Sequence, residues 1–201
     1  MATYKQGVLG PFSGKVGTVV GSSWRGIAYI RSLATKVGNP RTAGQVAARS
    51  KLALVARTLK NFASVIKAGF VNTGSVSPWS AAIKANLLHV KDSDSGLALD
   101  MKSLVLSDGS DEFSLTPVKT AASVDFSWKA PRVADLFYGG KLYAAAFNAA
   151  NAKAMVFVAD LSASSASMSL SSILSGEDDD VNVYYFVASP TASTPTTCVG
   201  D

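Results

Sequence analysis

The sequence has very little of the chemistry on which most enzyme sites depend. Cys198 is the only cysteine among 201 residues, which excludes an intrachain disulfide and a metal site built from several thiols. His89 is the only histidine, and no neighbouring motif supplies a partner for it. Nucleophilic sites of the Ser-His-acid or Cys-His kind need such a partner. The residue inventory therefore predicts a protein that is not an enzyme and that holds no metal or cofactor.

Long apolar runs are also missing. No stretch approaches the roughly 18 uninterrupted apolar residues that a membrane-spanning helix needs, and glycine, proline and lysine interrupt the first residues before a signal peptide could form. We therefore expect synthesis in the cytoplasm and no membrane insertion. The 48% hydrophobic composition is still enough to bury a core.

Acidic residues are absent from almost half of the chain, since the first of them is Asp92. Residues 1–91 hold 13 Lys and Arg and no acid, whereas residues 92–201 hold 6 Lys and Arg against 14 acids, which gives net charges of +13 and −8. Such a separation suits a polyanion at one end or head-to-tail association of copies, although a solvated surface without a function is the plain alternative. We predict a basic assembly segment at 1–91 and an acidic domain at 92–201.

The opening segment is rich in glycine and β-formers. Six glycines occur between Gly7 and Gly26 among valine, isoleucine, tyrosine and tryptophan. The apolar residues favour a pleated surface and the glycines permit turns, so we predict a β arm or hairpin, which either pairs with a neighbouring subunit or closes its own domain. The run from Gly10 to Val16 looks superficially like a phosphate-binding loop. It is one residue too short and has Val16 where a hydroxyl must bind Mg²⁺, so we reject that interpretation.

Two helices are expected next. Pro40 interrupts the chain and Thr42 can cap a helix that runs to about Ala68. Its apolar stripe consists of Leu52, Val55, Leu59, Phe62 and Ile66, and the basic side chains Arg49, Arg57, Lys60 and Lys67 lie in a narrow arc beside it. Ser77 and Pro78 begin a second helix that is expected to end near Lys91, with one face formed by Trp79, Ile83, Leu87 and Val90.

Beyond Asp92 the chain reads as short alternating strands separated by turn residues. We expect seven strands, at residues 97–106, 112–117, 122–129, 141–148, 154–160, 166–171 and 181–189. Val124, Phe126 and Trp128 alternate with polar residues, so one face of that strand should lie in a core. The predicted fold class is mixed and mainly β: a glycine-rich N-terminal β arm or hairpin, two helices, and a C-terminal immunoglobulin- or fibronectin-like β-sandwich.

Two groups of residues are candidates for contact with partners. The first is basic and aromatic and would contact another subunit or a polyanion; it comprises Lys15, Trp24, Arg25, Arg31, Arg41, Gln45, Arg49, Arg57 and Lys60. The second is the acidic run Glu177, Asp178, Asp179 and Asp180. This run lacks the spacing of an EF-hand loop, so it is either a solvated loop or a contact for the basic half of a neighbouring copy.

Several short motifs carry resemblances. The run from Gly14 to Gly26, GKVGTVVGSSWRG, resembles the opening of an uncharacterised bacterial protein family of about this length, and the resemblance continues through Asn39-Pro40-Arg41-Thr42. That family implies no activity, catalytic residue or cofactor, and the chain departs from it at Ala34, where a proline is expected. The segment from Asn39 to Arg49, which includes Gln45, is also similar to a motif in predicted structural proteins of tailed phages.

Three functions are compatible with these patterns. The first is a non-enzymatic structural subunit of a virus particle or a similar ordered assembly, in contact with other copies or with other structural proteins of the same assembly. The second is a sequence-independent nucleic-acid-binding protein that uses the basic N-terminal half. The third is a surface adhesion or carbohydrate-binding module, with stacking groups supplied by Trp128, Tyr138, Tyr143 and Tyr184.

Overall fold

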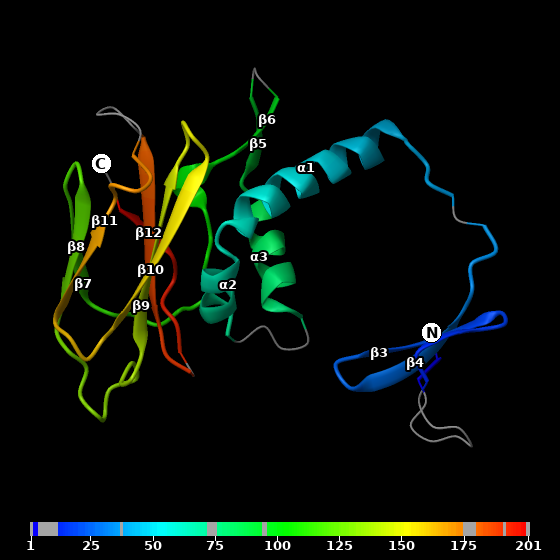
Figure 1. Cartoon of the computed structure of the whole chain (residues 1–201), viewed down its shortest axis with the longest axis horizontal. Coiled ribbons are helices and arrows are strands. Elements are labelled where there is room, and N and C mark those ends of the chain that lie inside the picture. The colour runs from blue at the N-terminus through cyan, green and yellow to red at the C-terminus, as the bar shows by residue number, and fades with distance from the viewer. Residues whose placement is uncertain are drawn as a thin grey trace. The chain divides into compact units, whose positions relative to one another are not determined.

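The chain forms two compact units, Met1–Thr42 and Ala43–Asp201. The computed structural model describes residues 2–3, 12–36, 38–71, 76–93, 96–174, 180–190 and 192–199. Figure 1 shows the secondary structure of both units. Each unit has its own architecture and is described in turn.

The N-terminal unit is a four-stranded antiparallel sheet. Its order is β1 (Ala2–Thr3), β4 (Ile27–Ser32), β3 (Val19–Trp24) and β2 (Gly14–Val16). Arg25 and Gly26 join β3 to β4 with φ values of 49° and 80°, which is the left-handed pair that a type I′ hairpin turn requires. The predicted hairpin is confirmed, while Gly7 and Gly10 lie outside the described residues.

The first predicted helix, 42–68, is wrong as a single element. It is divided into α1 (Ala43–Lys60) and α2 (Ala63–Gly69), and a third helix, α3 (Pro78–Leu87), follows. At the break the backbone N–H of Phe62 donates to Leu59 O at 2.9 Å, three residues back instead of four. This tighter turn directs the fully buried Phe62 ring into the core, edge-on to Tyr184 at 6.3 Å between ring centroids. Tertiary packing therefore overrides a continuous helical pattern.

The ends of the helices separate what the pattern predicts well from what it does not. Ser77 caps α3 by accepting from Ser80 N at 3.2 Å, and Pro78 is its first residue, as expected. The helix ends at Leu87, since the residues that follow form a hairpin of β5 (Val90–Ser93) and β6 (Gly96–Leu99). The apolar stripe of the first helix is buried except at Leu52, which is 45% exposed because the first turns of α1 lie in solvent.

Seven strands in two antiparallel sheets form the predicted β-sandwich. One sheet has the order β10 (Lys153–Asp160), β9 (Lys141–Asn148), β12 (Val181–Ala188), β13 (Thr197–Val199). The other has the order β11 (Ser165–Ser169), β8 (Ser123–Trp128), β7 (Leu115–Lys119). Val124, Phe126 and Trp128 point into the core between the sheets, as their alternation predicts. The immunoglobulin- or fibronectin-like fold class is confirmed.

The strand predicted at 97–106 is wrong over most of its length. Only Gly96–Leu99 is extended, and a short 3₁₀ helix, η1 (Met101–Ser103), follows it. Asp100 begins this turn by accepting from Lys102 N at 3.2 Å, and its hydrogen bond to Lys91 lowers the pKa of the Asp100 carboxyl. β13 was missed, because three residues are too few to show an alternating pattern.

A helical layer covers the outer face of the four-stranded sheet of the sandwich, β10-β9-β12-β13. Val55, Leu59 and Phe62 pack with Tyr184 and other sheet residues in a second buried cluster. Because both faces of β12 are covered, all of its residues except Tyr185 are buried. The helices therefore belong to the same unit as the sandwich, and the units divide after Thr42 rather than at Asp92, where the charge reverses.

No described helix has the length and apolar character needed to cross a membrane.

Candidate functional site

One face of the N-terminal sheet collects several of the predicted contact residues. The strand register places Lys15 opposite Val20, Val20 opposite Arg31, and Trp24 opposite Ile27. Opposite residues of antiparallel strands share a face, and so do alternate residues along a strand. The same face therefore carries two cations on either side of Val20 at one end, and aromatic and apolar side chains toward the other end; we call it the basic aromatic face and define it as Lys15, Val20, Trp24, Ile27, Tyr29 and Arg31.

The end of this face at the β3–β4 turn is open to solvent. Trp24 and Ile27 are 60% and 58% exposed, and Lys15 and Arg31 are also exposed. The guanidinium carbon of Arg25 lies 6.0 Å from the centroid of the Trp24 ring, a cation–π distance that keeps the positive charge beside the aromatic group. Exposed apolar side chains that share a face with cations are suited to a partner that offers both apolar and acidic groups.

The opposite face of the sheet packs against its own chain at one point. Phe12 lies over Gly21 so closely that a Cβ atom on Gly21 would collide with its backbone and ring, which is why this position needs glycine. Val16, on the same face, is 64% exposed. Among residues 12–36 and 38–42, only Val20 and Gly21 are buried, so the described part of this sheet has almost no core.

The other predicted basic contacts do not belong to this sheet. Gln45 and Arg49 lie four residues apart on the exposed first turns of α1, and Arg57 and Lys60 are exposed near its end. Arg41 is exposed just before α1. The structure thus brings four of the nine predicted residues into one sheet, namely Lys15, Trp24, Arg25 and Arg31.

The acidic run is described only at its last residue. Glu177, Asp178 and Asp179 lie outside the described residues, and Asp180 is exposed directly before β12. The described part of the chain contains no group of three or more His, Cys, Asp or Glu side chains positioned to hold a metal ion.

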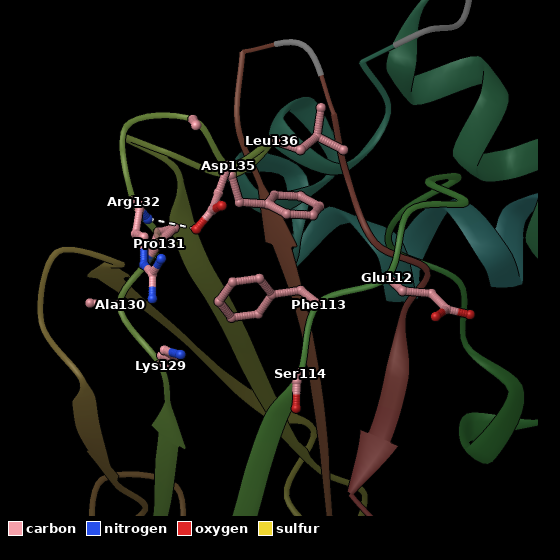
Figure 2. A pocket seen from close by; sticks show the side chains of 11 residues that line it. Glu112, Phe113, Ser114, Lys129, Ala130, Pro131, Arg132, Asp135 and Leu136 are labelled. Atoms are coloured by element: carbon pink, nitrogen blue, oxygen red, sulfur yellow. Dashed lines mark hydrogen bonds between the residues drawn. The ribbon is translucent and has the colours of Figure 1, made fainter.

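A concave surface lies at one end of the sandwich. It is a cleft of about 590 Å³ between residues 112–114 and 129–137, and Figure 2 shows the side chains that line it. The rings of Phe113 and Phe137 meet edge to face at 5.4 Å. The backbone N–H of Arg132 donates to the Asp135 carboxylate at 2.6 Å, so that this carboxylate closes a turn of the wall. Lys129, Arg132 and Asp135 are exposed, and none is a desolvated group of the kind that active sites use.

Three of the four aromatic residues considered for ligand stacking belong to the core. Trp128 is 7% exposed and donates from Nε1 to Leu161 O at 3.2 Å. Tyr184 is fully buried, donates to Met101 O at 2.7 Å, and has a pKa raised above its usual value by burial. Tyr143 stacks on Phe186 at 5.3 Å. Of the four, only Tyr138, at 55%, is largely exposed, whereas Tyr143 is partly buried and lines a cleft with Lys141 and Ala188.

Sequence reasoning missed Asn86 altogether. Its side chain is fully buried in α3 and holds the segment after η1 through two hydrogen bonds with Val105. The sequence gives no signal for this role, because the partner is backbone and lies 19 residues away. The contact is structural, and it fixes the helical layer beside the sheet.

The chain belongs to a family of unknown function, DUF6266, whose model matches residues 11–196. No curated protein matches the chain. Membership of an uncharacterised family is confirmed, while the similarity of residues 39–49 to phage structural proteins stays a prediction. The family description names no activity, so function has to be argued from the surfaces above.

Proposed function

We propose that this member of the DUF6266 family is a non-enzymatic structural subunit of a virus particle or a comparable ordered assembly, joined to its neighbours through the N-terminal sheet. The observation that supports the proposal is the near absence of a core in that sheet, where only Val20 and Gly21 are buried among the described residues from 12 to 42. A sheet of this size needs a covered apolar face for stability. A neighbouring subunit that covers the basic aromatic face would supply it.

Charge favours a second copy, or another acidic structural protein, as the neighbour. Residues 1–42 hold six Lys and Arg and no acid, whereas residues 92–201 hold 14 acids against 6 Lys and Arg. The exposed cations Lys15 and Arg31 lie on the same face as Trp24 and Ile27, an arrangement in which the charges steer association and the apolar side chains supply affinity. The sandwich surface of a neighbouring copy has the required sign. The final location would then be a virus particle or an extracellular assembly.

The first test removes the apolar side chains of the contact. The double variant carries Trp24→Ser and Ile27→Ser. Both of the replaced side chains are exposed in the wild-type chain, so the hairpin itself should persist. We expect the concentration at which copies associate to rise at least about tenfold, because loss of an interface tryptophan costs about 2 kcal/mol or more. Light scattering across a concentration series measures the midpoint, and electron microscopy shows whether the particles are ordered.

A matched control replaces an exposed apolar residue on a strand of the other unit. Val118→Ser in β7 changes a side chain that is 55% exposed, and it should leave the association midpoint unchanged. A wild-type chain that stays monomeric at every concentration and salt level contradicts the proposed function. So does a double variant that assembles as readily as the wild type.

A second candidate function, sequence-independent binding of single-stranded nucleic acid, is favoured by the same face. Trp24 and Tyr29 share it with Lys15 and Arg31, and aromatic groups beside cations are typical of surfaces that stack bases and neutralise phosphates. On this function, Lys15→Ala and Arg31→Ala together would lower the slope of log affinity against log salt by about 1.4. Fluorescence anisotropy with a single-stranded oligonucleotide measures that slope. Binding that does not weaken as salt is raised would argue against this function.

A further inference from the structure

Strand β10 forms one edge of the four-stranded sheet of the sandwich and has none of the features that usually protect an edge. It is eight residues long, pairs with β9 without interruption, and contains no proline and no charged residue between Lys153 and Asp160. Natural proteins protect such edges with charges, proline, bulges or short strands, because an open edge pairs with other chains. β10 is therefore the position in the sandwich where another strand can be added.

The other edge strands of the sandwich are shorter than β10, and one of them also carries proline and lysine. β7 contains Pro117 and ends at Lys119, whose ammonium group donates to Val181 O at 3.1 Å. β13 is three residues long, and β11 is a short strand in which serine alternates with alanine and methionine. The contrast makes the open edge at β10 a specific feature of this fold.

Burial confirms that one side of β10 is open. Residues of β10 contribute to both apolar clusters: Met155 and Phe157 to the core between the sheets, Ala154 and Val156 to the core beneath the helices. β12 lies between the same two clusters and is almost fully buried, whereas no residue of β10 is buried. Since both faces of β10 are in contact with these clusters, its exposure reflects an edge along which no described strand of the larger unit pairs.

The register shows which backbone groups are available. Leu161 N donates to Gly140 O at 3.2 Å, one step beyond the β9–β10 pair and in the same register. In antiparallel strands, hydrogen-bonded and non-hydrogen-bonded pairs alternate, so the odd-numbered residues of β10 bond to β9. The N–H and C=O groups that point away from the sheet are those of Ala154, Val156, Val158 and Asp160.

We propose that β10 is a self-association surface, on which two copies of the chain pair antiparallel about a twofold axis and join their four-stranded sheets into one. Centred on Phe157, this pairing sets Val156 against Val158 and Ala154 against Asp160, and every outward backbone group of the four finds a partner. The pairing also covers Val158, which is 46% exposed. A twofold contact of this kind is self-complementary, as closed dimers require.

Charge selects the antiparallel arrangement. Lys153 and Asp160 are the two charged residues of the strand and stand at opposite ends of it. In the antiparallel pairing the two Lys153 side chains lie at opposite ends of the contact, and so do the two Asp160 side chains, each of which keeps its ion pair with Lys141 of its own chain at 3.4 Å. Parallel pairing in register would bring like charges together. The inference shares with the proposed function only the requirement that copies associate. The surface it names is β10 of the unit 43–201, whereas the proposed function uses the N-terminal sheet.

The test uses the position whose N–H points outward and whose side chain is half exposed. Val158→Pro removes that donor and leaves the hydrogen bonds between β9 and β10 intact, as proline does on an edge strand. We expect the dimer dissociation constant of the full chain, measured by sedimentation velocity, to rise at least about tenfold. The matched control Val158→Thr keeps the N–H and the β-branched shape and should leave the constant within about twofold.

Amide exchange in the full-length wild-type chain locates the contact. Exchange at Val156 and Val158 should slow as protein concentration rises, while Met155 and Phe157, which bond to β9, are protected at every concentration. The inference is overturned if Val158→Pro leaves the dissociation constant unchanged. It is also overturned if the rate of amide exchange at Val156 does not change with protein concentration. Protection that appears only after another protein is added also overturns it, since the occupant is then not a second copy.

The outcomes separate this inference from the proposed function. If Val158→Pro has no effect on dimers while the Trp24→Ser and Ile27→Ser variant prevents larger particles, the β10 contact is absent and the assembly role stands. If Val158→Pro dissociates dimers and the N-terminal double variant assembles as the wild type does, the β10 contact stands and the proposed function fails. A chain that is monomeric under all conditions rejects both.

Discussion

Replacing Asn86 with alanine should lower the free energy of unfolding by about 2–4 kcal/mol, as estimated from the cost of leaving buried polar groups without partners. Asn86 Nδ2 donates to Val105 O at 2.7 Å and Asn86 Oδ1 accepts from Val105 N at 2.9 Å. Nδ2 also lies 2.9 Å from Ala82 O. Alanine removes both bonds to Val105 and leaves a cavity in a site from which solvent is excluded. Urea unfolding followed by circular dichroism measures the loss.

Two further variants separate the hydrogen bonds from the volume of the side chain. Asn86→Leu fills the space without replacing the bonds, and it should also be destabilising by about 2 kcal/mol or more. Lys84→Ala changes an exposed residue of the same helix and should stay within about 0.5 kcal/mol of the wild type. An Asn86→Leu variant as stable as the wild type would show that the link to Val105 contributes nothing.

The parts of the fold that could be predicted are those whose causes lie within a few residues. The start of α3 follows from Ser77, which caps it, and from Pro78, whose fixed φ suits a first helical residue. The strand from Ser123 to Trp128 follows from strict alternation, because its inner residues face one core and its outer residues face solvent. In both cases the local signal and the tertiary environment agree.

The helical layer shows why the rest could not be predicted. Along β12 the alternation of Val183 and Tyr185 with Asn182 and Tyr184 is typical of a sheet with one face in water. The structure instead covers that face with helices, and Tyr184 is fully buried against them. Which elements pack on a sheet depends on contacts between residues far apart in the chain. The same contacts bend the first helix at Phe62, and no local pattern indicates that break.

For the candidate site, sequence gives the residue types and structure gives the grouping. Lys15, Trp24 and Arg31 are basic or aromatic in the sequence, but only the strand register places them on one face. The turn at Arg25 and Gly26 sets that register for Trp24 and Arg31, and the pairing of β2 with β3 sets it for Lys15. A shift by one residue would move each strand's side chains to the opposite face. The two strand pairings together therefore determine whether these residues lie on one surface.

The division of the chain changes how its charge is to be understood. The unit 43–201 holds 13 Lys and Arg and 14 acids, which is a net charge of −1, while residues 1–42 carry six positive charges and no acid. The larger unit is nearly neutral because exposed helix cations such as Arg57 and Lys60 offset the acids of the sandwich. On the proposed function, attraction between copies would come from local acidic surface on the sandwich and not from the net charge of the unit. Such attraction acts over about 8–10 Å at physiological salt, so it orients copies only once they are close.

Replacing Gly109 with alanine should be the most disruptive single-methyl change in the described glycines of the larger unit. A Cβ atom there would collide with the backbone carbonyl of Ser193, and backbone yields less readily than a side chain. The two segments are held together at this point: Thr196 Oγ1 accepts from Leu106 N and Ser107 N, both at 2.8 Å. Separating them breaks these bonds to buried groups, so we expect a loss of about 3 kcal/mol or more in the free energy of unfolding.

The matched control is Gly44→Ala, in the first turns of α1. Nothing lies within 4 Å of a Cβ atom at this exposed helical position. Alanine there should raise stability by up to about 1 kcal/mol, because glycine loses more backbone entropy in a helix. The two variants add the same methyl group. If the urea midpoint falls for Gly109→Ala and rises for Gly44→Ala, relative to the wild type, the loss at Gly109 is assigned to the close approach of the 193–196 segment. If the two variants have equal urea midpoints, this approach is loose enough to admit a side chain. The hydrogen bonds from Leu106 N and Ser107 N to Thr196 Oγ1 then do not hold the two segments tightly together.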